Sequence, residues 1–350
     1  MQETFQKTPP ISSPSSLSVK DLELHCKSYK GADTKRSIFQ LTTTLALFIV
    51  ACSLMLYSIT VSYWITAFLT LPTAGLLVRL FIFQHDCGHG SFFNSRKAND
   101  WTGRLLGVLT FTPYDFWRRA HNKHHATSGD LDRRSIGGID TITVQEYQAL
   151  SKWKQFMYRV YRNPLVLLIF GTPIYVIVAQ RIPFNQQTKF HENYHTLPVR
   201  SIWKSIILTN LAIVAFYGGL AFFTGFTEIL IVYLSILTVA AWIGGWLFYI
   251  QHQFEDTYWE RSENWSLQEA ALMGSSYYEL PKVMQWFSGN IGLHHIHHLC
   301  SKIPNYKLQD CMDAQPALKH INRMTFRESL QCVRLKLWDE ETKQLVTIPS

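Results

Sequence analysis

The feature that most constrains this fold is a long stretch without charge. Between Arg36 and Arg79 lie 42 residues, and none of them is Asp, Glu, Lys or Arg. In a soluble protein each element needs a polar face toward water, so such a gap is rare. A helix that crosses a bilayer needs about 20 consecutive apolar residues. The stretch therefore predicts two membrane-spanning helices and excludes an ordinary cytosolic enzyme, a disordered chain and a disulfide scaffold.

Further apolar runs follow later in the chain. Residues 205–227 and 229–254 are separated by Glu228 alone, which predicts a second tight hairpin. The run 163–180 contains two prolines and a glycine, and at 1.5 Å per residue it reaches only about 27 Å. We expect it to be re-entrant or interfacial rather than spanning. The expected spans are 38–59, 62–83, 205–227 and 229–251.

The basic residues predict the orientation. Segment 84–163 has twelve Lys and Arg against seven Asp and Glu, whereas the turns near residues 60 and 228 have no Lys or Arg. Basic loops stay in the cytoplasm, so we expect 84–163, 181–204 and both termini inside, in a multi-pass protein of the plasma membrane. The net charge of +8 reflects this bias rather than nucleic-acid binding.

Together these patterns predict an all-α integral membrane protein. Four spanning helices form two hairpins, with one re-entrant or interfacial segment and a cytoplasmic helical cap built from 84–163 and 252–350. Residues 1–36, rich in Ser and Pro over 9–18, are expected to be a disordered tail, and 37–350 to form a single domain. None of the six cysteines forms a CxxC pair, so we expect reduced thiols.

The histidines point to chemistry. Nine of the fourteen lie in three five-residue windows with the patterns HxxxH, HxxHH and HxxHH. Spacings of three and four place side chains on one face of a helix, where imidazoles can converge on a metal. The alternative, surface or core histidines, suits a lone residue better than three clusters. The windows contain His85 and His89; His121, His124 and His125; and His294, His295, His297 and His298.

All three windows fall on the predicted cytoplasmic side, which indicates a single site. Imidazole binds Zn, Cu, Fe and Ni, so the ligand type alone does not decide the metal. The first window reads HDCGH and lacks the Glu of the zinc motif HExxH. Eight or nine histidines exceed the ligands of one tetrahedral zinc and fit two ions, each with an open position. Long apolar helices beside the site favour a lipid chain as substrate.

These motifs carry a family resemblance. HDCGHGSFF, HNKHH and GLHHIHH resemble the three histidine boxes of the membrane fatty acid desaturase superfamily. YRNP at 161–164, WLFYIQHQFEDTYWE at 246–260, ENWS at 263–266 and GNIGLHHIHHLCSKIPNYKL at 289–308 are similar to bacterial acyl-lipid desaturases. The resemblance runs from about residue 36 to the end of the chain and leaves out the N-terminal tail.

The resemblance implies an O₂-dependent enzyme with two non-haem iron ions. Such an enzyme introduces a cis double bond into acyl chains of membrane phospholipids, near the carboxyl end, with the delta-5 position favoured. The chain has no HPGG motif of a fused cytochrome b5, so ferredoxin or flavodoxin is the implied electron donor. His295 has no counterpart among the family ligands. The implied ligands are His85, His89, His121, His124, His125, His252, His294, His297 and His298.

Other polar residues near the boxes allow two interpretations each. A basic set could dock an acidic electron carrier, hold lipid phosphates, or simply be positive-inside charge; it comprises Arg118, Arg119, Lys123, Arg133 and Arg134. An acidic set could orient imidazoles or be solvated; it comprises Asp86, Asp130, Asp132 and Asp256. Four tryptophans are expected to be interface anchors; they are Trp117, Trp246, Trp259 and Trp286. Arg79 is expected to snorkel.

Two alternatives to a desaturase remain. A hydroxylase, ketolase or epoxygenase would use the same boxes, and only its products would separate it. A His-rich metal transporter or sensor belongs to another class. Transporters place polar ligands inside their spanning helices near the midplane, whereas these boxes lie outside the apolar runs.

Overall fold

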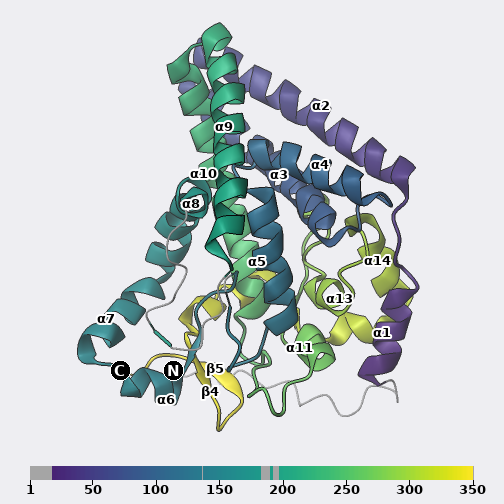
Figure 1. Cartoon of the computed structure of the whole chain (residues 1–350), viewed down its shortest axis with the longest axis vertical. Helices are drawn as coiled ribbons and strands as arrows, with labels where there is room; N and C mark the ends of the chain where they lie inside the picture. Colours follow the sequence, from purple (N-terminus) through teal and green to yellow (C-terminus); the bar gives the residue numbers. More distant parts are fainter. Residues whose placement is uncertain (1–17, 136, 183–189, 192–196, 350) are drawn as a thin grey trace.

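Four long apolar helices dominate the structure. The computed structural model describes residues 18–135, 137–182, 190–191 and 197–349. Within this part of the chain, four helices are long and apolar enough to cross a membrane. They confirm the predicted helical membrane fold and its four spans, and α9 and α10 stand side by side in the upper part of Figure 1. The four are α2 (Thr34–Ile59), α3 (Tyr63–His89), α9 (Val199–Thr224) and α10 (Phe226–His252).

The four helices form the two expected hairpins. Ser62 caps α3 and accepts a hydrogen bond from the backbone of Trp64. Gly225 joins α9 to α10 with a φ of 97°, a conformation that favours glycine. α3 and α10 both run past their predicted ends at residues 83 and 251, and they end at His89 and His252. The spanning helices therefore carry three of the predicted ligands into the cap themselves.

The apolar run 163–180 is a broken helical segment. A π-helix at Leu165–Gly171 leads into α8 (Thr172–Ile177) and a short 3₁₀ turn at Ala179–Arg181. This segment is bent by 53° from α7 (Lys152–Tyr161), as in a broken span or a re-entrant loop. That it does not cross the bilayer stays a prediction. Residues 183–189, in the following loop, lie outside the described residues.

Short helices and two small sheets build the cap below the spanning helices (Figure 1). A three-stranded sheet has the order β1-β4-β5, with β1 and β4 parallel; β2 and β3 pair in parallel. The further helices are α4 (Arg96–Leu109), α5 (Tyr114–Thr127), α6 (Val144–Ala149), α11 (Leu267–Met273), α12 (Lys282–Phe287), α13 (His294–Leu299), α14 (Asn305–Asp313) and α15 (Phe326–Ser329). The strands are β1 (Ile142–Thr143), β2 (Tyr277–Tyr278), β3 (Arg323–Met324), β4 (Leu337–Asp339) and β5 (Gln344–Val346).

The N-terminal segment differs from the expected disordered tail. Within 1–36, residues Val19–Lys27 form helix α1, which Ser18 and Asp21 close with a capping box. Leu22 and Cys26 are buried against residues of α11 and α13. The sequence analysis missed this short helix because it extended the Ser- and Pro-rich character of residues 9–18 to the whole of 1–36. The predicted tail over 1–17 lies outside the described residues. All six cysteines of the chain are free thiols.

Arg79 does not snorkel. Its side chain is only 6% exposed, inside α3, and its guanidinium lies over the rings of Phe83 and Trp286. It donates hydrogen bonds to the carbonyl of Trp286 and to Thr44. The cap helix α12 packs against α3 at this level and covers the arginine. The sequence could not show this because the covering residues come from 200 positions further along the chain.

Candidate metal centre

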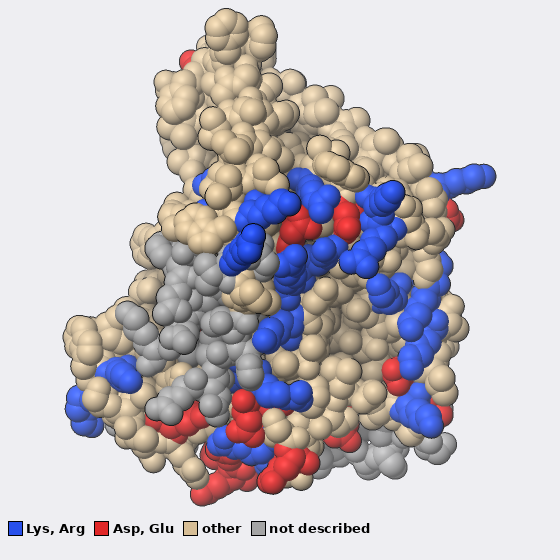
Figure 2. Space-filling model, viewed as in Figure 1, with Lys and Arg blue, Asp and Glu red and all other residues tan. Residues whose placement is uncertain are grey.

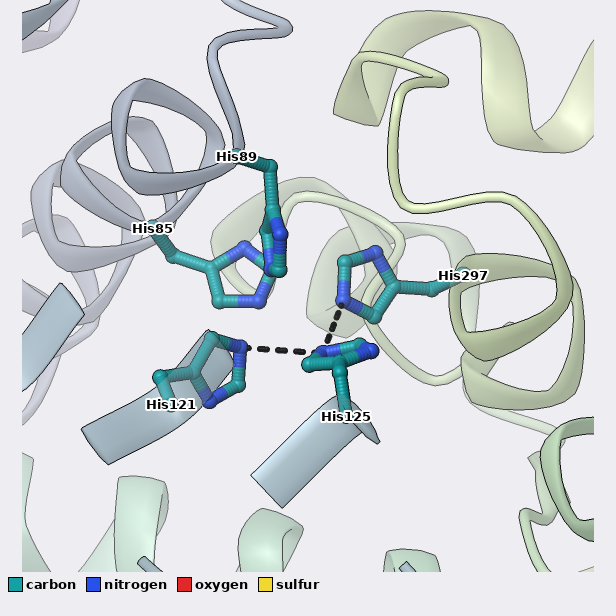
Figure 3. Close-up of side chains that lie close together, drawn as sticks. All are labelled: His85, His89, His121, His125 and His297. Carbon is teal, nitrogen blue, oxygen red and sulfur yellow. Dashed lines mark hydrogen bonds between the residues drawn. The ribbon is translucent and has the colours of Figure 1, made fainter. Parts of the chain in front are cut away.

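Five imidazoles from three helices converge below the spanning helices. Helix α3 supplies His85 and His89, α5 supplies His121 and His125, and α13 supplies His297 (Figure 3). One ring nitrogen of each lies within 4.8 Å of those of the other four. On α3 and α5 the pairs are four residues apart, so each helix presents both rings on one face. This group is called cluster A below.

A second group lies beside the first. Ring nitrogens of His124, His252 and His298 lie within 4.8 Å of one another. His294 joins them, because its Nε2 is 3.1 Å from Nε2 of His252. We call these four residues cluster B. His252, at the end of α10, thus lies with the box histidines, as the resemblance implied.

The two clusters share a boundary. The rings of His125 in cluster A and His298 in cluster B stack, with centroids 4.0 Å apart and planes 18° from parallel. His124 and His125 are consecutive in the chain and point into different clusters. Helices α5 and α13 therefore each serve both groups. The structure brings all nine predicted ligands into one place, where they form two adjacent clusters of ring nitrogens.

The nitrogen spacing fits metal ions. In cluster A, Nε2 of His125 is 3.1 Å from that of His121 and 3.2 Å from that of His297. In cluster B, Nε2 of His252 is 3.0 Å from that of His124. Two nitrogens that each lie about 2.1 Å from one ion are about 3.0–3.4 Å apart when the angle at the ion is near 90–109°. Both clusters therefore have the dimensions of a coordination shell.

Polar atoms without partners support the same fit. Among the described residues, Nε2 of His89 and Nε2 of His298 are buried and have no hydrogen-bond partner. Buried polar atoms of this kind need an explanation, and a bound ion is one. Burial, reinforced by neighbouring imidazoles, holds the pKa of His124, His125 and His297 well below the usual range. Neutral rings keep a lone pair for a metal.

Two of the imidazole rings, those of His85 and His252, are oriented by contacts with residues outside the clusters. Nδ1 of His85 is 3.3 Å from Oδ1 of Asp86, whose Oδ2 accepts 2.8 Å hydrogen bonds from the backbone and side-chain nitrogens of Asn305. Nδ1 of His252 is 2.8 Å from the carbonyl oxygen of Gly274. Such contacts fix the tautomer and leave Nε2 free for a metal.

Of the four candidate carboxylates, Asp86 alone contacts a predicted ligand among the described residues. Asp256, expected to hold His252, instead accepts from Gln344. Asp130 accepts from Arg133 and Ser262. Asp132 accepts from Arg261. A backbone carbonyl replaces the expected carboxylate at His252, which no sequence pattern indicates. The sequence analysis did not single out Asn305. Its signal was present, because Asn305 lies in the family motif at 289–308, just after the third box.

His295 points away from both clusters. It is fully buried, and its Nε2 is 3.0 Å from the carbonyl oxygen of Leu318. Burial lowers its pKa to about 4. The prediction that His295 is not a ligand agrees with this position on the opposite side of α13. This contact connects α13 to the 3₁₀ helix that contains Leu318.

Trp117, one of the four predicted interface anchors, packs against the metal centre. Its ring stacks on His121 of cluster A, with centroids 4.7 Å apart and planes 13° from parallel, and it meets Phe81 edge to face. Trp117 therefore supports the imidazole of His121, and its place at the membrane interface stays a prediction. The Nε1 of Trp246 points to Tyr278, at 3.4 Å.

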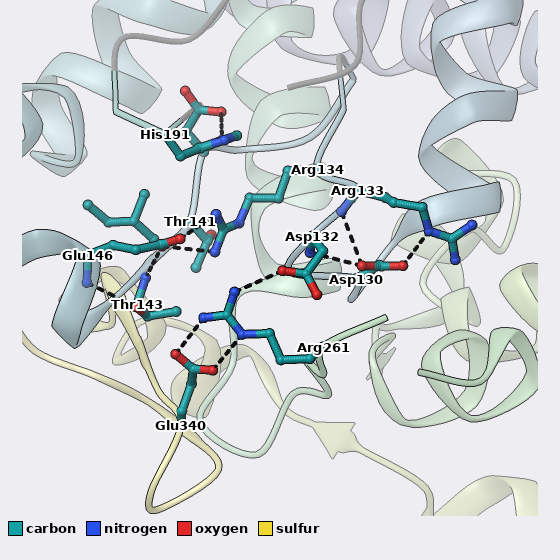
Figure 4. Close-up of polar contacts among 12 residues, drawn as sticks. Asp130, Asp132, Arg133, Arg134, Thr141, Thr143, Glu146, His191, Arg261 and Glu340 are labelled. Atoms are coloured by element: carbon teal, nitrogen blue, oxygen red, sulfur yellow. Dashed lines mark hydrogen bonds and ion pairs between the residues drawn. The ribbon is translucent and has the colours of Figure 1, made fainter. Parts of the chain in front are cut away.

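Most of the basic residues near the second box are paired. Arg134 forms two 2.9 Å hydrogen bonds with Glu146, and Arg133 forms an ion pair with Asp130 (Figure 4). Arg118 contacts Asp100 and Asp115. Among the described residues, Arg119 and Lys123 have no carboxylate partner. Only these two of the five remain free to attract an acidic partner.

A pocket opens beside cluster B. His124 and His252 form one wall, and Phe248, Trp259 and Thr141 are among its other lining residues. The ring of Phe248 lies 5.7 Å from that of His124. Charged side chains, those of Arg134 and Asp140, also line the pocket, so its lining is mixed and does not single out an acyl chain.

The comparisons with known proteins decide the family. The fatty acid desaturase family profile matches residues 39–326. A fatty acid desaturase of Bacillus subtilis is 42% identical over 328 residues, which cover 94% of this chain and 90% of that protein. The chain belongs to the fatty acid desaturase family. It is therefore an oxidoreductase of fatty acyl chains, as the resemblance implied.

More distant desaturases are also similar to this chain. An sn-1 acyl-lipid omega-3 desaturase (ferredoxin) of Synechocystis is 28% identical over 246 residues, with 67% of this chain and 63% of that protein covered. An sn-2 acyl-lipid omega-3 desaturase (ferredoxin) of Arabidopsis thaliana is 28% identical over 243 residues, with 67% and 51% covered. For this desaturase the four apolar helices indicate a multi-pass membrane protein.

Proposed function

We propose that this desaturase uses two iron ions and O₂ to introduce a cis double bond into acyl chains of membrane phospholipids, with the delta-5 position favoured. The observation that carries the proposal is the pair of adjacent imidazole clusters, each with nitrogen spacings of 3.0–3.2 Å. The proposed ligands are His85, His89, His121, His125 and His297 in cluster A, and His124, His252, His294 and His298 in cluster B.

The bound ions would supply the oxidising chemistry, in which two hydrogens leave adjacent carbons and O₂ is reduced to water with two further electrons and protons. The residues of the chain provide the setting. All-nitrogen ligands leave the ions more electrophilic than carboxylates would, which suits attack on an unactivated C–H bond. Asp86 and the carbonyl of Gly274 hold two rings in position. Burial of the clusters excludes bulk water from the centre.

Electrons are proposed to come from ferredoxin or flavodoxin, with the metal centre on the cytoplasmic side of the plasma membrane. Two relatives carry ferredoxin in their names. Lys and Arg gather below an upper part that is almost free of charge (Figure 2). Arg119 and Lys123 are suitable contacts for an acidic carrier. If they are, exchange of Arg119 for Glu should raise the ferredoxin concentration needed for half-maximal rate, and an unchanged value would exclude this surface.

Product analysis tests the proposal most simply. The chain is expressed in a host that lacks other desaturases, and the fatty acids of its phospholipids are analysed by gas chromatography with mass spectrometry. We expect a new cis double bond near the carboxyl end of existing chains. Hydroxylated or keto products alone would instead assign the same centre to a hydroxylase or ketolase, and a double bond near the methyl end would reject the delta-5 position.

A further inference from the structure

A second, polar pocket lies where the cap meets the first hairpin. Arg36 and Gln40 of α2, Arg79 of α3, Lys282 of α12 and Asn305 of α14 are among its lining residues. In Figure 1 the purple N-terminal end of α2 lies above α14 on the right. Ser37 and Tyr306 connect these two elements through their hydroxyls, 3.1 Å apart. The pocket is separate from the one beside cluster B.

Arg79 gives this pocket a buried positive charge. The side chain is 6% exposed, and its hydrogen bonds go to neutral acceptors on Thr44, Trp286 and Gln40. Among the described residues no carboxylate forms an ion pair with it. A guanidinium has five N–H donors, so two remain beyond these three bonds. Buried charges are normally paired, so the guanidinium of Arg79 lacks the negative partner that its burial calls for.

Counting the other charged side chains of the pocket, positive charges outnumber negative ones. Arg36 is 3.9 Å from Asp310, the one carboxylate in the pocket lining. Lys282 is exposed on α12 and has no ion pair in the described chain. Three cations therefore face one carboxylate. Arginine and lysine together suit the oxygens of a phosphate group.

Exposed apolar side chains lie next to the cations of this pocket. Phe39 of α2 is 67% exposed, and Val283 and Met284 of α12 are 69% and 52% exposed. Exposed apolar side chains next to cations are expected at the boundary between lipid tails and headgroups. We propose that this pocket binds the phosphodiester group of the membrane phospholipid whose acyl chain is desaturated.

The pocket adjoins the metal centre. Its residue Asn305 donates to Asp86, and Asp86 contacts His85 of cluster A. Arg79 precedes His85 by six residues on α3, which is about 9 Å along a helix axis. A headgroup held so close brings the first carbons of the chain, rather than its methyl end, toward the ligands. The inference rests on the proposed function for the identity of the substrate.

Lipid binding to the purified full-length chain tests the pocket directly. Fluorescent phosphatidylglycerol is titrated into detergent-solubilised protein, with a glycolipid of the same chains as the probe without phosphate. We expect Arg79→Gln and Lys282→Gln each to weaken phosphatidylglycerol binding about tenfold, which is about 1.4 kcal/mol, because each removes a charged hydrogen-bond donor to the phosphate. Both variants should leave glycolipid binding unchanged. Lys282 is exposed, so its exchange does not threaten folding.

Arg181→Gln is the matched control. Arg181 also lies over an aromatic ring, that of Phe111, but it is not part of the pocket lining. Equal phosphatidylglycerol binding by all variants would overturn the inference. Lys282→Gln should also raise the KM for phospholipid and leave kcat near the wild-type value, whereas an unchanged KM would reject the substrate assignment. If the wild-type chain makes no double bond, the proposed function fails, while the binding series still tests the pocket.

Discussion

At the scale of single residues, the centre depends on where each imidazole nitrogen points. His252 is the proposed ligand that no histidine box contains, and its Nε2 lies 3.0 Å from that of His124 and 3.1 Å from that of His294. We predict that His252→Ala loses most of the iron of cluster B and abolishes desaturation, while the protein still inserts in the membrane. Iron analysis of the purified variant checks this, and a full iron content with normal product would refute it.

The matched control is His295→Ala. This variant also removes a buried imidazole from the same region, but from the face of α13 that binds the carbonyl of Leu318. It should keep its iron. It should lose about 1–3 kcal/mol of stability, because that buried carbonyl loses its partner, and thermal unfolding in detergent measures the loss.

Asp86 offers a second test at this scale. Its carboxylate connects His85 with both nitrogens of Asn305. An amide in its place keeps the shape and removes the negative charge that fixes the ring. We expect Asp86→Asn to lower iron affinity about 10–100-fold, as for other partners of metal-bound histidines. Iron titration against a competing chelator checks this, and unchanged affinity would leave Asp86 with a purely structural role.

At the scale of helices, close packing of the broken segment against α10 depends on one glycine. A Cβ at Gly245 would meet Cγ2 of Thr172 in α8 at 2.4 Å, whereas a Cβ at Gly244 would meet nothing within 4 Å. We predict that Gly245→Val destabilises the protein by about 1–3 kcal/mol, the usual effect of overpacking. Gly244→Val should have a much smaller effect. Equal thermal stability of the two variants would contradict the observed packing of α8 on α10.

The helices also show how far the sequence reaches. The uncharged stretch between Arg36 and Arg79 predicts α2 and most of α3, because span length and apolarity are local properties. The sequence places the end of α3 too early, since the polar face of His85 and His89 looks like a loop until the partner helices cover it. Helix α1 was missed because its apolar face is short and is buried only by contact with α11 and α13, which come from distant parts of the chain.

In the site, too, local sequence features were predictable and tertiary arrangements were not. Periodicity groups the histidines, and the family resemblance adds His252. Neither shows that His124 and His125 serve different clusters, because that split depends on how α10 and α13 approach α5. The carbonyl of Gly274 and the stacking of Trp117 on His121 are also tertiary facts. Chemistry carried by residue type was predictable, whereas chemistry carried by backbone atoms or by distant neighbours was not.

At the scale of the whole molecule, the account predicts which loops face the cytoplasm. If the broken segment after α7 does not cross the bilayer, the loop that follows lies in the cytoplasm with the metal centre. A cysteine at position 190, introduced as Phe190→Cys, should then resist a membrane-impermeant maleimide in intact cells and react after lysis. The unsubstituted chain controls for its native cysteines. Labelling from outside would show that the segment spans.

The central claim is that two iron ions in this fold remove hydrogen from a phospholipid chain. The most direct measurement is the mass of phospholipid after reaction with the purified chain, ferredoxin, its reductase and O₂, before and after iron is removed. We predict that the phospholipid loses two hydrogens, that chelation stops the reaction, and that two equivalents of iron per chain, but not zinc, restore it. A gain of oxygen instead, or full activity without iron, would contradict the account.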